Sequence, residues 1–141
     1  MSPAQPSRKQ ARRDALFVLY QHEVTSSPFA VLFARMKASG GYAPGEFSTQ
    51  LVEGVAARRA EIDACIGEHS RTWTLARMAP LERNILRLAT FELLDGATPP
   101  AVVVDEAVRL AKRYASDEAG ALVNGVLGGI LKDRRVDRGE E

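Results

Sequence analysis

Apolar residues recur along this chain every three or four positions, which is the spacing of an α-helix that buries one face. A clear example is the set Phe29, Leu32, Phe33 and Met36. The same period predicts six helices, over residues 8–24, 28–39, 46–68, 80–95, 100–114 and 117–132. The short β-branched run 102–104 directly follows two prolines, so we interpret it as the start of a helix.

Capping residues flank these predicted helices. Ser7, followed by Gln10 three positions later, forms a capping-box pattern for the first helix. Gly96 is placed to end the fourth helix, and Ser116 or Asp117 to begin the sixth. The fourth helix has apolar residues around most of its circumference, which predicts a central position in the fold.

The length of 141 residues is that of one domain, enough to bury roughly 68–70% of the surface of the unfolded chain. We therefore predict one all-α domain over residues 8–132. A flexible tail is expected at 1–7 and a flexible charged tail at 133–141, where no apolar period continues. Nothing in the chain resembles a secretory leader or a long apolar span, so we expect a reduced, soluble, cytoplasmic protein.

Positive charge gathers at the start of the chain. The formal net charge is +1, of which residues 1–20 contribute +3 (four basic residues, one acidic), residues 132–141 contribute 0, and the remainder −2. The four cations are Arg8, Lys9, Arg12 and Arg13. They lie on the same side of the helix as the apolar residues two turns later. One side of a helix cannot be both solvated and buried along its whole length, so we expect the first turns to project beyond the core.

These cations also lie at the positive end of the helix dipole, where each costs about 0.3–1 kcal/mol unless an anion binds. Cations one turn apart can follow a phosphate backbone, and Tyr20 offers a ring on which an unpaired base can stack. From the residues alone, a nucleic-acid contact and a simple solvated face remain alternatives.

Enzymatic chemistry finds little support in the sequence. Neither His22 nor His69 has a Glu three residues before it, as a di-metal site in a helical bundle would require. Cys65 lies between apolar helix positions and is interpreted as a small core residue. Gly125 lies within a helical pattern, which indicates a close contact between helices. We expect no catalytic residue, no metal and no cofactor.

Seven segments in a fixed order carry a resemblance to a known family. They are Ala15-Leu16-Phe17-Val18-Leu19-Tyr20-Gln21, Gly54-Val55, Ile62-Asp63, Trp73, Glu82-Arg83-Asn84-Ile85-Leu86-Arg87-Leu88-Ala89, Asp105-Glu106-Ala107-Val108-Arg109-Leu110-Ala111-Lys112 and Val123-Asn124-Gly125-Val126-Leu127. Together with the basic start, this order resembles the NusB family of bacterial transcription antitermination factors, over about residues 8–131. The resemblance implies an all-α fold of two helical subdomains packed across each other, and no catalysis.

The resemblance also implies partners. Members of the family bind a short single-stranded boxA RNA together with NusE, a small-subunit ribosomal protein. They do so within a complex that keeps RNA polymerase elongating on ribosomal RNA operons. Exposed acids in the body of the chain suit a basic partner of this kind; those expected are Glu46, Glu53, Glu61 and Asp105. Whether the chain is a monomer or a homodimer stays open.

Carried over residue by residue, the resemblance implies an RNA surface. Its expected members are Arg8, Lys9, Arg12 and Arg13 on phosphates, Tyr20 on a base or the backbone, Glu82 on a base edge, and Glu118 and Leu122 beside them. Many relatives have an aromatic residue where this chain has Leu122, which removes a stacking contact. Asn124 has two interpretations, an RNA contact or a partner for buried backbone.

Three further expectations concern packing and the alternative function. Arg83 and Arg87, one turn apart, are expected to pair with acids such as Glu82 or Glu92. Trp73 is expected to anchor the junction between subdomains. The alternative to an RNA-binding factor is a helical protein–protein adaptor with no RNA-binding role of its own.

Overall fold

The computed structural model describes residues 6–40, 43–71 and 73–137, and for 135–137 it describes the backbone alone. This part of the chain is all-α and contains no strand. Its helices are α1 (Arg8–Thr25), α2 (Phe29–Gly40), α3 (Glu46–Ala57), α4 (Arg59–His69), the 3₁₀ turn η1 (Leu75–Arg77), α5 (Pro80–Asp95), α6 (Pro100–Tyr114) and α7 (Asp117–Asp137). Among these helices none combines the length and the apolar character needed to cross a membrane.

The helix ends use the predicted caps. The Ser7 hydroxyl accepts a hydrogen bond from the Gln10 amide at 3.1 Å, so it closes the start of α1. Gly96 ends α5 in the left-handed conformation at φ 79°, which glycine adopts without strain. The Ser116 hydroxyl accepts from the Ala119 amide at 3.0 Å and so begins α7.

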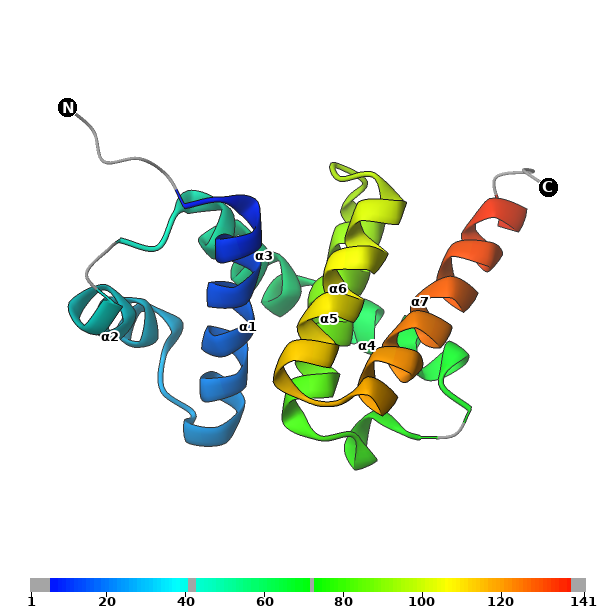
Figure 1. Cartoon of the computed structure of the whole chain (residues 1–141), viewed down its shortest axis with the longest axis horizontal. Helices are drawn as coiled ribbons and strands as arrows, with labels where there is room; N and C mark the ends of the chain where they lie inside the picture. Colours follow the sequence, from blue (N-terminus) through cyan, green and yellow to red (C-terminus); the bar gives the residue numbers. More distant parts are fainter. Residues whose placement is uncertain (1–5, 41–42, 72, 138–141) are drawn as a thin grey trace.

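Helix α5 lies at the centre of the fold, as its apolar circumference predicted. It contacts α1 and α3 on one side and α4, α6 and α7 on the other. Helices α1 to α3 form one subdomain and the later helices pack across it (Figure 1). The ends of α1 and α6 and the starts of α5 and α7 lie together at the lower end of the view.

Two predicted boundaries differ from the structure. The helix expected over 46–68 is broken at Arg58, because an unbroken helix of this length would be about 34 Å long and could not lay both halves against α5. The C-terminal boundary expected at 132 also lies elsewhere, since α7 continues to Asp137. Residues 1–5 of the first expected tail and 138–141 of the second lie outside the described residues.

Two packing expectations were wrong. Trp73 is 48% exposed and therefore does not anchor a subdomain junction. Gly125 is exposed, and a Cβ built there would meet nothing within 4 Å. The close approach lies instead at Gly54 in α3, where a Cβ would lie 2.2 Å from Phe91 Cζ in α5. The missing side chain of Gly54 is what lets α3 pack closely on the central helix.

We expect Gly54→Ala to destabilise the fold, because the added methyl group overlaps the Phe91 ring. Such overpacking costs about 1–3 kcal/mol. Gly67→Ala in α4 is the matched control, since a Cβ there meets nothing within 4 Å and gains about 1 kcal/mol in helix propensity. In urea unfolding, the unfolding free energy of Gly67→Ala should exceed that of Gly54→Ala by at least this overpacking cost. Equal stabilities would show that Phe91 moves aside freely.

Candidate nucleic-acid interface

The first turn of α1 presents two exposed cations. The Arg8 guanidinium carbon lies 4.1 Å from the centre of the Phe47 ring in α3, so this charge is held above an aromatic face. Lys9 has 62% of its side chain exposed, and its ammonium lies 4.0 Å from a Glu106 carboxylate oxygen in α6. Both groups remain accessible to a phosphate.

Arg12 requires a correction, because it is buried and its hydrogen bonds go to a carboxylate. It is 4% exposed, and its Nε and Nη2 donate to the two Glu92 oxygens at 2.9 and 2.8 Å. The hydrogen bonds to Glu92 raise the Arg12 pKa. Helix α1 is therefore packed from its second turn onward and does not project from the core. Arg12 cannot contact phosphate without leaving the buried Glu92 uncompensated.

Arg13, the next residue of α1, is partly exposed. Its Nη2 is 3.7 Å from a carboxylate oxygen of the buried Asp14. Its side chain lines a hollow between α1 and α6. Of the four predicted phosphate contacts, the structure thus leaves Arg8, Lys9 and Arg13 at the surface.

The remaining predicted contacts gather at the other end of α1. Tyr20 is half-buried near the end of that helix, and Glu82 is half-buried in the first turn of α5. Glu118 is exposed in the first turn of α7, and Leu122 one turn later packs partly against the core. These helix ends lie at the same end of the molecule (Figure 1). Cationic and aromatic contacts are therefore at opposite ends of α1, about 18 Å apart.

Asn124 is exposed on α7, so it does not satisfy buried backbone. It lines a shallow groove between α6 and α7 together with Val104, Asp105 and Val108. Asp105 lies inside α6, where its carboxylate pairs with Arg109 at 3.4 Å. The exposed amide of Asn124 thus remains available to a partner.

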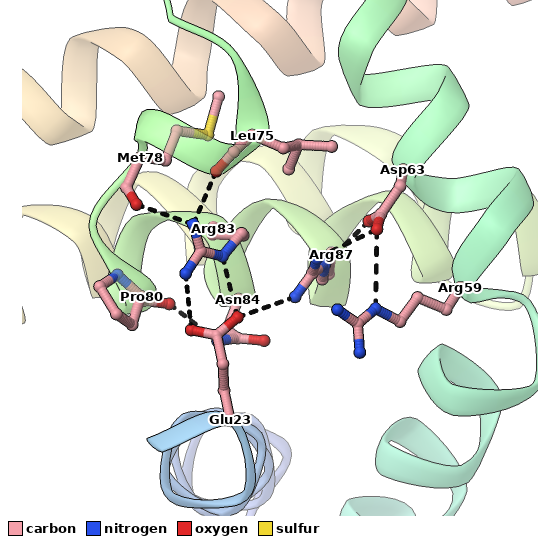
Figure 2. A network of polar contacts seen from close by, with 9 residues as sticks. All are labelled: Glu23, Arg59, Asp63, Leu75, Met78, Pro80, Arg83, Asn84 and Arg87. Atoms are coloured by element: carbon pink, nitrogen blue, oxygen red, sulfur yellow. Dashed lines mark hydrogen bonds and ion pairs between the residues drawn. The ribbon is translucent and has the colours of Figure 1, made fainter.

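A polar network joins the lower end of α1 to α5 and α4 (Figure 2). Glu23 of α1 accepts hydrogen bonds from Arg83 Nε at 2.9 Å, from Arg83 Nη2 at 2.8 Å and from Arg87 Nη1 at 3.2 Å. Arg87 also donates to both oxygens of Asp63, at 2.8 and 3.0 Å. Arg83 and Arg87 therefore pair with acids on other helices, and not with Glu82 or Glu92 as the sequence suggested.

This network also fixes the chain before α5. Arg83 Nη1 donates to the carbonyl oxygens of Leu75 and Met78, at 2.7 and 2.9 Å, so η1 is held against the start of α5. Glu23 is one turn beyond Tyr20, and Arg83 directly follows Glu82. The Glu23–Arg83 pair thus sets the position of Tyr20 relative to Glu82, a role that sequence reasoning missed.

Groups that could support redox, nucleophilic or metal chemistry are poorly placed for it. Burial raises the Cys65 pKa, which disfavours the reactive thiolate, and its side chain packs on the core as predicted. In residues 6–40, 43–71 and 73–137, no three His, Cys, Asp or Glu side chains gather as metal ligands would.

Comparison with known proteins agrees with this description. The model of the NusB family matches residues 9–132. The chain is 42% identical over 127 residues to the transcription antitermination protein NusB of Saccharopolyspora erythraea, covering 88% of this chain and 86% of that protein.

Two solved structures are similar in fold. One is NusB of T. maritima, with a TM-score of 0.81, 31% identity, and coverage of 92% of this chain and 93% of that one. The other is of the antitermination factors NusB and NusE in complex with dsRNA, with a TM-score of 0.80 and 33% identity. That match covers 89% of this chain and 96% of the other.

Proposed function

The chain belongs to the NusB family, and from this premise we propose that it is a transcription antitermination factor that binds boxA-type single-stranded RNA together with NusE. In this role it promotes processive transcription of ribosomal RNA operons within an RNA polymerase complex in the cytoplasm. A solved relative of 33% identity is a NusB–NusE complex with RNA, which supports both classes of partner.

The observation that carries the proposal is the arrangement along α1. This helix has exposed cations in its first turn and Tyr20 near its end, where Glu82, Glu118 and Leu122 also lie. Single-stranded RNA is bound by cations that follow the phosphates and by groups that contact bases. We assign phosphate contacts to Arg8, Lys9 and Arg13.

At the opposite end of the helix, we assign Tyr20 to a base or the backbone and Glu82 to a base edge. Glu118 and Leu122 complete this surface, and Asn124 is assigned a separate RNA contact from the groove between α6 and α7. Leu122 is partly packed on the core, so it supplies apolar contact instead of an aromatic stack. We therefore expect the affinity for RNA to depend strongly on the cations of α1.

The body of the chain offers acidic side chains to the protein partner. Glu46 and Glu53 are both exposed on α3 and make no ion pair within the part of the chain that the structure describes. Glu61 and Asp105 are also exposed, but they pair with Arg58 and Arg109. Charge complementarity with a basic ribosomal protein would favour association at α3.

Removing the two exposed cations in the first turn of α1 should weaken RNA binding and reduce its salt dependence. In Arg8→Gln/Lys9→Gln, the slope of log affinity against log salt for single-stranded boxA RNA should be smaller by about 1.4, about 0.7 for each phosphate contact. The matched control is Arg35→Gln/Lys37→Gln, which removes two exposed cations from α2. Titrations at several salt concentrations measure both slopes. An equal slope in wild type and the α1 variant would identify these cations as a solvated face.

The same titration distinguishes the alternative function. A chain that binds the NusE-like partner but no RNA, alone or in the complex, would be the protein–protein adaptor. The low count of accessible cations on α1, reduced by the burial of Arg12, is the feature that favours this alternative.

A further inference from the structure

A hollow of about 310 Å³ lies between α1 and α6, and the α6 residues that line it are not among those assigned to RNA from the family resemblance. Lys9 and Arg13 line it from α1, and Arg109, Arg113 and Tyr114 line it from α6. Helix α6 thus adds two cations and an aromatic ring to the surface that already carries the cations of α1. We call this hollow the α1–α6 groove.

The two helices that form the α1–α6 groove run side by side in the same direction. Lys9 lies opposite Glu106 at 4.0 Å, and Phe17 lies opposite Tyr114 with ring centres 5.0 Å apart. Both pairs are separated by the same number of residues (106 − 9 = 97 and 114 − 17 = 97). The groove follows α1 from Ser7 to Arg13, about 9 Å, and α6 from Glu106 to Tyr114, about 12 Å. On α6 the lining reaches Tyr114, the last residue of that helix, and the ends of α6 and α1 lie together at the lower end of the view (Figure 1).

The α1–α6 groove is positively charged. It has four cations and one carboxylate, Glu106, which gives a net charge of 4 − 1 = +3. Arg109 pairs with Asp105 at 3.4 Å, but both side chains are more than half exposed, so a phosphate can replace this contact at little cost. The Arg113 guanidinium carbon lies 5.5 Å from the centre of the Tyr114 ring, and Arg113 makes no ion pair with any described residue.

We propose that the α1–α6 groove binds single-stranded RNA, with Arg109 and Arg113 as phosphate contacts and Tyr114 as a surface for an unpaired base. A groove of cations that ends at an aromatic ring is the arrangement by which proteins hold single strands. It supplies the path between the two ends of α1, which the residues of α1 alone leave about 18 Å apart. This inference rests on the proposed function, because the same RNA would occupy both ends.

The double variant Arg109→Gln/Arg113→Gln tests the inference on the full chain. For single-stranded boxA RNA, the slope of log affinity against log salt should be smaller by about 1.4, and binding at 0.1 M salt should weaken on the order of tenfold. Both side chains are exposed, so the thermal unfolding of the variant should match that of wild type. Arg35→Gln/Lys37→Gln again serves as the control for net charge.

The outcomes separate this inference from the proposed function. If wild type binds RNA and Arg8→Gln/Lys9→Gln weakens it, while Arg109→Gln/Arg113→Gln leaves slope and affinity unchanged, the proposed function stands and the groove inference is overturned. That result would also be expected if an acidic protein segment occupied the groove. If wild type binds no RNA with or without the NusE-like partner, both proposals fail.

Discussion

Replacing Arg12 with Gln should lower the free energy of unfolding by about 3–5 kcal/mol, the largest effect we expect from a single substitution in this chain. The side chains of Arg12 and Glu92 are 5% and 6% exposed and are joined by two hydrogen bonds. In the variant, the carboxylate of Glu92 stays buried and keeps only the Thr98 hydroxyl, at 3.3 Å, as a described partner. A buried charge without its counter-ion is strongly unfavourable.

Arg35→Gln is the control for this prediction, because it removes the same charge from an exposed residue of α2 that makes no ion pair with any described residue. Its effect on stability should lie within about 0.5 kcal/mol of zero. Arg12→Leu/Glu92→Met should recover much of the lost stability, since apolar side chains can replace a buried pair. Urea unfolding measures all three variants. An Arg12→Gln protein as stable as Arg35→Gln would mean that the Arg12–Glu92 pair is open to solvent.

Glu23→Gln should have the second largest effect, with a loss of about 1–3 kcal/mol in unfolding free energy. Glu23 accepts three hydrogen bonds from Arg83 and Arg87, whose side chains are 15% and 6% exposed. A neutral amide removes the charge that compensates these guanidinium groups and can accept through one oxygen alone. Glu61→Gln is the control, because Glu61 also accepts two hydrogen bonds from an arginine, Arg58, but this pair lies at the surface. Neutralising Glu61 should therefore leave the stability almost unchanged.

The effect of Glu23→Gln should depend on pH with a defined sign. The hydrogen bond from Arg83 is the main cause that lowers the Glu23 pKa below its usual range. The stabilisation is then fully present above the pKa of the unfolded chain, about 4.3, and is lost as pH falls through the lowered folded pKa. Unfolding free energies of wild type and variant should therefore converge in acid below about pH 4. A difference that stays constant from pH 6 to pH 3 would contradict this assignment.

Loss of the Glu23 carboxylate should also weaken the binding of RNA. The Glu23–Arg83 pair holds the end of α1 against the start of α5, and so it positions Tyr20 relative to Glu82. These are positioning residues, because neither needs to touch RNA for the arrangement to matter. Weaker RNA binding with an unchanged salt slope is the expected result, since no phosphate contact is removed.

The helices were predictable from sequence because their determinants are local. A period of 3.6 residues identified the buried faces, and the cap residues Ser7 and Gly96 marked helix ends within one or two positions. The central position of α5 followed from its apolar circumference. The break at Arg58 was missed because the apolar stripe continues across it, and it is tertiary packing on α5 that divides the two helices.

The pairings between helices were not predictable in the same way, since they join residues far apart in sequence. Arg12 and Glu92 are 80 positions apart, and Glu23 and Arg83 are 60 apart. One available signal was overlooked. Helix α5 has apolar residues nearly all round, so the acid at position 92 is expected to be buried and to need a buried cation as its partner. Arg12 lies on the same side of α1 as the buried leucines of that helix. That signal would have placed Arg12 in the core.

The central claim is that this chain and a NusE-like protein form one RNA-binding surface. The most direct measurement is a titration of labelled single-stranded boxA RNA with the chain alone and with an equimolar NusE-like partner, at the same salt concentration. We predict a one-to-one protein complex that binds the RNA more tightly than the chain alone, because the joined surface contacts more nucleotides. Equal affinity with and without the partner, or no binding in either case, would contradict the account.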